Sequence, residues 1–146
     1  MSEFLVIIIK TLDDGGFQFC QTILIIKVLE STGIEDCNGL PTLTKVEVPL
    51  IIDVNGYESN RYWPNSYASV IRVILCLASN TRPDISFAVH QCARFTHNTK
   101  ASHKTAVKRI CWYLQVTKYN FLVFNPSKKL VVGCYADADF VGLWVH

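Results

Sequence analysis

Acidic side chains are the first groups of this chain to consider for chemistry. Asp13 and Asp14 precede Gly15 and Gly16. Adjacent aspartates beside two glycines are typical of a turn rather than of a metal site. A second pair, Asp137/Asp139, would suit a small metal-dependent nuclease, but two carboxylates two residues apart are common and no local signature surrounds them. A divalent metal site needs several oxygen ligands.

Cysteine and histidine do not form a metal-binding pattern. The six cysteines include no C-x-x-C pair, and the spacing of His90, Cys92, His97 and His103 matches no standard zinc site. A thiol enzyme would need a cysteine beside a histidine in space, which spacing alone cannot indicate. The start of the sequence has no export signal and no apolar run long enough to span a membrane. We therefore expect reduced thiols in a cytoplasmic or nuclear protein that is not secreted.

Positive charge is concentrated in one part of the chain. Residues 1–84 carry six Lys or Arg and ten Asp or Glu, whereas residues 85–136 carry eight Lys or Arg and no Asp or Glu. A long stretch without a carboxylate indicates a polyanionic partner, most simply nucleic acid. The alternative is a solvated basic face that pairs with the acidic first part.

A helix expected over residues 102–114 carries this charge on one face. At 100° per residue, its apolar stripe lies opposite four candidate nucleic-acid-binding residues: Lys104, Lys108, Arg109 and Trp112. Cations for phosphate and a ring for stacking suit a single strand or a hybrid backbone. Three nearby cations add charge: Arg94, Lys100 and Lys118. The alternative for Trp112 is packing on a neighbouring element.

The elements around this helix predict a mixed α+β fold. We expect an N-terminal β-hairpin, then a helix over residues 21–32 that ends at Gly33, and a long irregular connection to residue 66. Three helices follow, beginning near Tyr67, Pro83 and Ser102. A C-terminal strand pair, Phe121–Phe124 and Leu130–Tyr135, ends the pattern. The apolar residues after it suggest an incomplete domain or a missing partner.

Four segments are distinctive in combination: Tyr67–Ile71, Thr81–Val89, Ala106–Leu114 and Tyr135–Phe140. Together they resemble the C-terminal part of a copia-type retrotransposon polyprotein, over nearly the whole chain. The resemblance implies three segments of a reverse transcriptase that runs into ribonuclease H. They are a post-palm hairpin, helix and connection (1–66), a thumb- or connection-like helical segment (67–120) and the truncated start of a ribonuclease H-like domain (121–146).

The resemblance also implies where catalysis lies in that family. Its polymerase site is a Tyr-x-Asp-Asp motif, which this chain lacks. Its ribonuclease H site holds two Mg²⁺ ions with several carboxylates, and Asp137 matches the first of them. One aspartate cannot hold two such ions, so we expect a fragment that is catalytically silent by itself and needs no cofactor.

The expected partners follow from the same resemblance. They are RNA or DNA, bound weakly, and the missing polyprotein domains, with no membrane and no small-molecule substrate. The alternative function is an interaction module that docks through its apolar C-terminal strand. Arg72, Val116 and Phe121 stand where the family usually has glycine, and Val141 stands where it has alanine. A bulky residue would be strained wherever such a turn needs a positive φ, so we expect a decayed or truncated copy.

Overall fold

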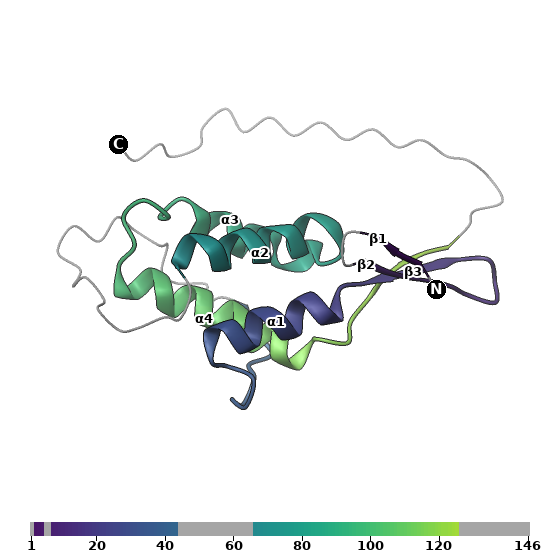
Figure 1. Ribbon diagram of the computed structural model, residues 1–146, viewed down its shortest axis with the longest axis horizontal. Helices are drawn as coiled ribbons and strands as arrows, with labels where there is room; N and C mark the ends of the chain where they lie inside the picture. The colour runs from purple at the N-terminus through teal and green to yellow at the C-terminus, as the bar shows by residue number, and fades with distance from the viewer. Residues whose placement is uncertain (1, 5–6, 44–65, 126–146) are drawn as a thin grey trace.

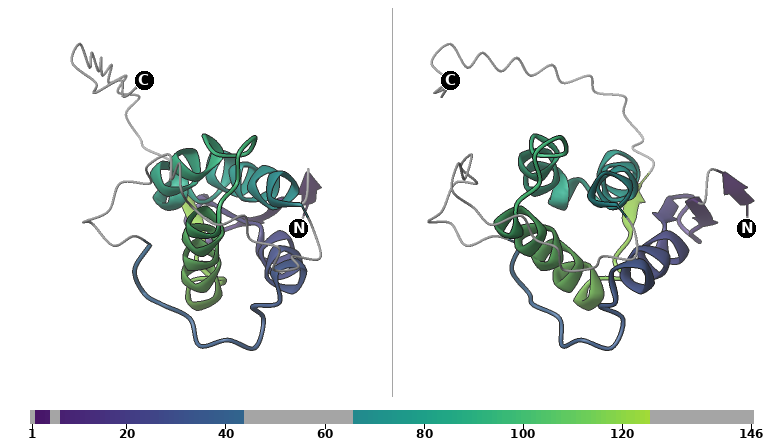
Figure 2. Two further views of the ribbon diagram at one scale, coloured as in Figure 1. Left: turned by 90° about the vertical axis from the view of Figure 1, so that its left-hand side faces the viewer. Right: turned by 60° about the vertical axis from the view of Figure 1, so that its left-hand side comes forward.

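The protein has the predicted α+β composition in a computed structural model that describes residues 2–4, 7–43 and 66–125 (Figure 1). The strands are β1 (Ser2–Phe4), β2 (Ile7–Thr11), β3 (Phe17–Cys20) and β4 (Leu122–Phe124). The helices are α1 (Thr22–Thr32), α2 (Tyr67–Asn80), α3 (Ser86–Ala93) and α4 (Ala101–Val116), with a short 3₁₀ helix, η1 (Pro83–Ile85), before α3. The helices pack in two layers, α2 with α3 and α1 with α4 (Figure 2).

The turn predicted around Asp13 and Asp14 joins β2 to β3. The amide of Leu12 donates to the carbonyl of Gly16 at 2.8 Å, which closes the loop. The carboxylate of Asp14 accepts a hydrogen bond of 2.9 Å from the amide of Gly16. This contact explains the acidic pair as turn chemistry, because an aspartate that bonds the backbone two residues later stabilises a tight turn.

The segment after β3 is a helix, as expected, and it ends at the expected glycine. Gly33 has a φ of 66°, and the amide of Ile34 donates to the carbonyl of Leu29 at 3.1 Å. A left-handed residue followed by this longer bond is the usual way to end a helix, and glycine adopts it without a steric penalty.

The three predicted helices after residue 66 are also confirmed. Ser66 caps α2, since its hydroxyl accepts from the amide of Ser69 at 3.2 Å. Pro83 begins η1 rather than α3 itself, which starts three residues later at Ser86. Arg72, where the copia-type family usually has glycine, is exposed on α2, so its charge stays in water.

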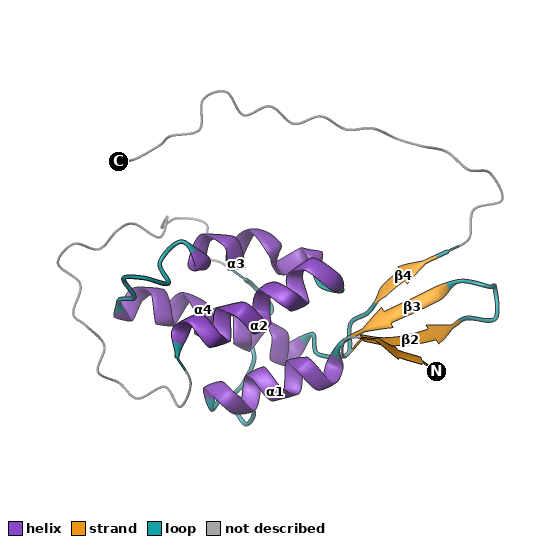
Figure 3. Cartoon of the chain, turned by 45° about the horizontal axis from the view of Figure 1, so that its top comes forward, coloured by secondary structure: helices purple, strands orange, loops and turns teal. Residues whose placement is uncertain are grey.

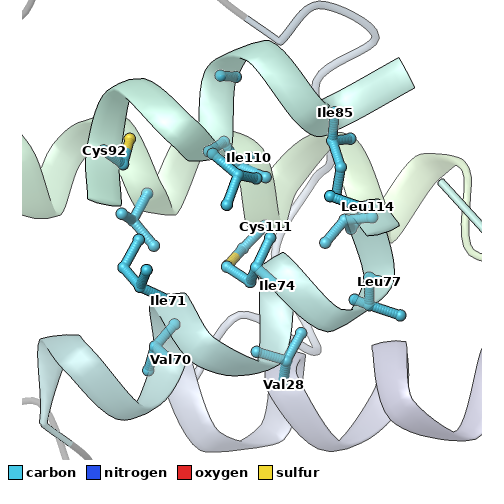
Figure 4. Close-up of a cluster of buried hydrophobic side chains, with 14 of the residues drawn as sticks. Val28, Val70, Ile71, Ile74, Leu77, Ile85, Cys92, Ile110, Cys111 and Leu114 are labelled. Carbon is cyan, nitrogen blue, oxygen red and sulfur yellow. The ribbon is translucent and has the colours of Figure 1, made fainter. Parts of the chain in front are cut away.

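One hydrophobic core joins all four helices. Figure 4 shows side chains from α1, α2 and α4 in a single cluster. Its fully buried members include Val28 of α1, Ile74 and Leu77 of α2, and Ile110 and Leu114 of α4. The core therefore contains residues from both sides of the expected segment boundary at residue 66.

The first of the two expected C-terminal strands, β4, is present, and it extends the N-terminal hairpin. Among the described residues, β4 pairs with β3 in an antiparallel register that places Phe17 opposite Phe124. The rings of Phe19 and Phe124 meet edge to face at 5.3 Å. The pairing arises because α1 and α4 lie side by side, so the chain that leaves α4 meets the free edge of β3 (Figure 3). The second expected strand, Leu130–Tyr135, lies outside the described residues.

A buried arginine fixes the end of α4. Arg82 is 3% exposed, and its guanidinium binds both carboxylate oxygens of Asp84, at 3.0 Å and 2.8 Å. The same group donates to the carbonyl oxygen of Thr117 at 3.1 Å and to its hydroxyl at 2.7 Å. Tyr113 adds a hydrogen bond of 2.8 Å from its hydroxyl to Asp84, and its ring lies 5.5 Å from the guanidinium carbon. These contacts join η1 to the last turn of α4.

A second set of polar contacts joins the start of α1 to the same place. Gln21 is 1% exposed and accepts a 2.9 Å hydrogen bond from Thr81, the residue before Arg82. Thr22 donates to the carbonyl of Lys118 at 3.3 Å, just beyond α4. The ends of α1, α2 and α4 thus meet in one polar joint, from which β3 and β4 leave side by side.

The joint also sets the ionisation of its carboxylate. Partial burial by itself would raise the pKa of Asp84, but the hydrogen bonds from Arg82 and Tyr113 outweigh it and lower the pKa below its ordinary value. The pKa of Tyr113 is raised, by desolvation and by its hydrogen bond to Asp84. Both shifts keep Asp84 charged and Tyr113 protonated, the states that this network needs.

We expect Arg82→Met to lower the free energy of unfolding by about 2–3 kcal/mol. The substitution removes the charged hydrogen bonds to Asp84 and Thr117, and it leaves the Thr117 carbonyl without this donor. Urea unfolding followed by circular dichroism measures the change. The matched control is Arg72→Met, which removes an exposed arginine and should stay within about 0.5 kcal/mol of the wild type. Equal effects of the two substitutions would show that the joint does not stabilise the fold.

We expect the stabilisation from Asp84 to depend on pH. Because its folded pKa is lowered, this contribution is complete above the unfolded pKa of about 3.8 and is lost as the pH falls through the folded value. The stability difference between the wild type and Asp84→Asn should therefore be largest at neutral pH and shrink below about pH 4. Urea unfolding of both proteins across this range tests it, and a difference that does not change with pH would contradict it.

Candidate nucleic-acid interface

Three of the four candidate binding residues of α4, Lys104, Lys108 and Arg109, lie on the side of the helix that faces away from the core, whereas the fourth, Trp112, packs against the core. Val107, Ile110 and Leu114 are buried, whereas the candidates are half-buried. The burial of Val107, Ile110 and Leu114 confirms the predicted apolar stripe of the helix, because residues three and four apart share a face. Val116, where the copia-type family usually has glycine, is the last residue of α4 and is exposed, so this position needs no positive φ.

The first half of α4 gathers cations. His103 holds this end in place: its Nδ1 accepts from the amide of Lys100 at 3.0 Å, and its ring stacks on Phe95 at 4.1 Å. The stack ties the loop after α3 to the first turn of α4, so that Arg94 lies at the same end as Lys100 and Lys104. Backbone amides at a helix N-terminus add positive potential there. This end of α4 therefore suits an anion.

The second half of α4 is covered by the connecting segment, residues 34–43. The amide of Leu40 donates to the carbonyl of Trp112 at 3.2 Å, and the guanidinium of Arg109 donates to Thr42 at 3.0 Å. Gln115 donates to the carbonyl of Glu35 at 2.7 Å. The backbone approaches so closely that a Cβ on Gly39 would lie 2.7 Å from the Trp112 carbonyl.

This cover divides the predicted site. Lys104 and Lys108 lie on the first half of α4, which faces the basic end, whereas Arg109 and Trp112 are engaged by the connecting segment. Trp112 also packs against the hydrophobic core, which is the packing role named as the alternative to stacking. Lys118 lies beyond the far end of the helix, about 20 Å from Lys104 at 1.5 Å per residue. Its ammonium lies 5.3 Å from the ring centroid of Tyr119.

The sequence did not reveal that residues 34–43 cross α4. Gly39 was the available signal, because a glycine in an irregular segment often marks a close approach of two backbones. Thr42 and Gln115 were not among the candidates, although both hold the crossing in place. Their identities alone predict no partner, since contacts between residues 67 and 80 positions apart are set by the fold.

The residues considered for other chemistry do not form a site within the described ranges. No group of three or more His, Cys, Asp or Glu side chains there could hold a metal ion. His103 is 1% exposed and is used in the cap of α4. Burial raises the pKa of the Cys92 thiol to about 11 and that of Cys111 to about 12, so neither is a thiolate near neutral pH. Asp137 and Asp139 lie outside the described residues.

In the described part of the chain, no helix is long and apolar enough to cross a membrane. No family model matches the chain, and no solved structure matches it.

Comparison with curated proteins finds relatives among transposon proteins. The chain is 35% identical over 79 residues to the retrovirus-related Pol polyprotein from transposon RE1 of Arabidopsis thaliana, a match over 54% of this chain and 5% of that protein. It is 33% identical over 94 residues to the corresponding polyprotein from transposon TNT 1-94 of Nicotiana tabacum, over 64% of this chain and 7% of that one.

A shorter relative gives the same result. The putative transposon Ty5-1 protein of Saccharomyces cerevisiae is 32% identical over 73 residues, a match over half of this chain and 24% of the yeast protein. The matched region thus spans only a small part of each of these relatives. Over about half of its length, the chain is similar to a small part of the retrovirus-related Pol polyproteins of transposons.

Proposed function

We propose that the chain is a fragment of a copia-type reverse transcriptase/ribonuclease H polyprotein, which binds RNA–DNA hybrids weakly and has no catalytic activity by itself. The observation that carries the proposal is the similarity to Pol polyproteins from transposons, at 33–35% identity in two plant elements. Of the family motifs quoted above, Thr81–Val89 supplies Arg82 and Asp84 to the polar joint, and Ala106–Leu114 lies within α4. They therefore keep a structural role in this fragment.

Binding would use the basic end of α4. Lys104 and Lys108 are half-buried side chains one helical turn apart, with Lys100 at the N-cap of α4 and Arg94 at the C-cap of α3. No residue from 85 to 136 is acidic, so no carboxylate of this segment opposes an approaching phosphate. Because Trp112 is packed against the core and its carbonyl bonds the connecting segment, the contacts are made by cations on the phosphate backbone. Such contacts position a nucleic acid without reading its sequence.

We expect Lys104→Ala/Lys108→Ala to weaken binding of a labelled RNA–DNA hybrid and to reduce its dependence on salt. In B-DNA, each phosphate contact contributes about 0.9 to the slope of log K against log salt concentration. The loss of two lysine contacts should therefore reduce this slope by about 2. Gel-shift titrations at several salt concentrations measure both effects.

The matched control for this experiment is Lys10→Ala/Lys27→Ala, which removes the same charge from exposed positions on β2 and α1. It should lower affinity only slightly, through the change in net charge. If both double variants lose the same affinity and slope, the basic end of α4 is not the binding site.

We expect the full chain to leave a labelled RNA–DNA hybrid intact in the presence of Mg²⁺. The expectation rests on the resemblance, which supplies one matching carboxylate, Asp137, where the family uses several. Incubation with and without EDTA, followed by denaturing electrophoresis, tests it. Cleavage that requires Mg²⁺ and disappears in Asp137→Asn would contradict the proposal and establish the small metal-dependent nuclease instead.

The second candidate function is an interaction module. The observation in its favour concerns β4, which is the described part of the C-terminal strand region. Val123 and Phe124 of this strand are 39% and 55% exposed. An apolar strand at the edge of a sheet can dock on another chain.

A further inference from the structure

Two arginines of this fold use the same edge of the guanidinium group in different ways. The Nε and Nη2 atoms of arginine carry parallel N–H groups, which suit an acceptor with two oxygens. In Arg82 both donors are filled, because Nε donates to one carboxylate oxygen of Asp84 at 3.0 Å and Nη2 donates to the other at 2.8 Å. In Arg109 the edge is half filled. Its Nη2 donates to the hydroxyl of Thr42 at 3.0 Å, whereas its Nε is buried and has no acceptor among the described residues.

The unfilled Nε of Arg109 indicates that an acceptor other than a hydroxyl suits this edge. A buried N–H group without an acceptor is costly, and one hydroxyl oxygen leaves one of the two parallel donors unused. Among the described residues, no carboxylate forms an ion pair with Arg109. A phosphate group presents two oxygens to the same edge, and the hydrogen bonds are stronger because both partners are charged. The edge therefore fits a phosphate better than it fits Thr42.

Arg109 lies next to the cations of the proposed nucleic-acid site. It follows Lys108 directly on α4, and Lys104 lies one turn before Lys108. Consecutive residues of a helix are separated by only 1.5 Å along its axis. A phosphate backbone that contacts Lys104 and Lys108 therefore passes beside Arg109.

The connecting segment, residues 34–43, closes this edge of Arg109. It is held on α4 by the hydrogen bond from the amide of Leu40 to the carbonyl of Trp112, at 3.2 Å, and it supplies the Thr42 hydroxyl. The segment includes Glu35 and Asp36 but no Lys or Arg, so its charge opposes an approaching phosphate. Thr42 itself is exposed, which means that water can replace Arg109 as its partner.

We propose that Arg109 is a further phosphate-binding residue, which the Thr42 hydroxyl holds in a closed state. The inference rests on the proposed function, because the phosphate belongs to the nucleic acid that Lys104 and Lys108 contact. On binding, Arg109 exchanges one hydrogen bond to a neutral hydroxyl for two hydrogen bonds to a phosphate. Thr42 then bonds to water. The connecting segment thus reduces the affinity for nucleic acid by the cost of breaking one hydrogen bond.

Thr42→Val tests this competition, because it removes the hydroxyl and keeps the shape of an exposed side chain. We expect the full-length variant to bind a labelled RNA–DNA hybrid about three- to tenfold more tightly than the wild type, since one hydrogen bond no longer has to be broken. The slope of log K against log salt concentration should not change, because both bound states contain the same phosphate contacts. The matched control is Thr11→Val, which removes an exposed hydroxyl from β2 and should leave the affinity unchanged.

A double-mutant cycle shows whether the gain in affinity depends on the guanidinium. Arg109→Ala should weaken binding of the hybrid and reduce the salt slope by about 0.9, the contribution of one phosphate contact. In the Arg109→Ala background, Thr42→Val should have no effect on affinity, because the two residues act through one contact. A gain that persists without Arg109 would overturn the inference.

The binding titrations also separate this inference from the proposed function. Equal affinities of the wild type and Thr42→Val would overturn the inference alone, because the wild type would still bind through Lys104 and Lys108. Binding by Thr42→Val but not by the wild type would support the inference and contradict the proposed function of the wild-type chain. Binding by neither protein would overturn both.

Discussion

The buried guanidinium of Arg82 is the constraint on which the rest of the structure depends. A charge removed from water must be matched by partners, and Arg82 finds them in Asp84, two residues away, and in Thr117, thirty-five residues away. The second partner fixes the end of α4 against η1. Because Gln21 and Thr22 bind the same region, the start of α1 is fixed there too. β3 and β4 then leave the helices side by side, which allows them to pair.

The joint also explains why the two ends of α4 differ. The C-terminal end is held by polar contacts to Arg82 and is crossed nearby by the connecting segment, so its donors and acceptors are used within the fold. The N-terminal end is held by the His103 cap and by the stack of His103 on Phe95, whose rings are both buried. The proposed function uses the cations at this end, Lys100, Lys104 and Lys108, to contact a polyanion. A phosphate contact depends on charge and distance rather than on a shaped pocket.

Local signals predicted the elements of this fold, and contacts distant in sequence decided how they combine. The Asp-Gly turn, the helix end at Gly33 and the start of a helix near Tyr67 each depend on residues within a few positions, and each was predicted. The pairing of β4 with β3 and the crossing of residues 34–43 over α4 depend on where helices place remote segments. For this reason the sequence alone could not decide whether Trp112 stacks on a nucleic-acid base or packs on a neighbouring element. Arg82 was noticed only as part of a family motif, although an arginine two residues before an aspartate could have suggested an internal ion pair.

The basic end of α4 and the small sheet lie at opposite ends of the helical layers (Figure 1). α4 runs from one to the other, and its sixteen residues separate them by about 24 Å at 1.5 Å per residue. The Debye length is about 8–10 Å at physiological salt, so charges this far apart in water are largely screened from each other. A nucleic acid on the cations and a partner chain docked on β4 would therefore bind with little direct influence on each other. Any coupling between them would pass through the fold itself, and the Arg82 joint is its polar part, because there the end of α4 meets the start of α1 beside the sheet.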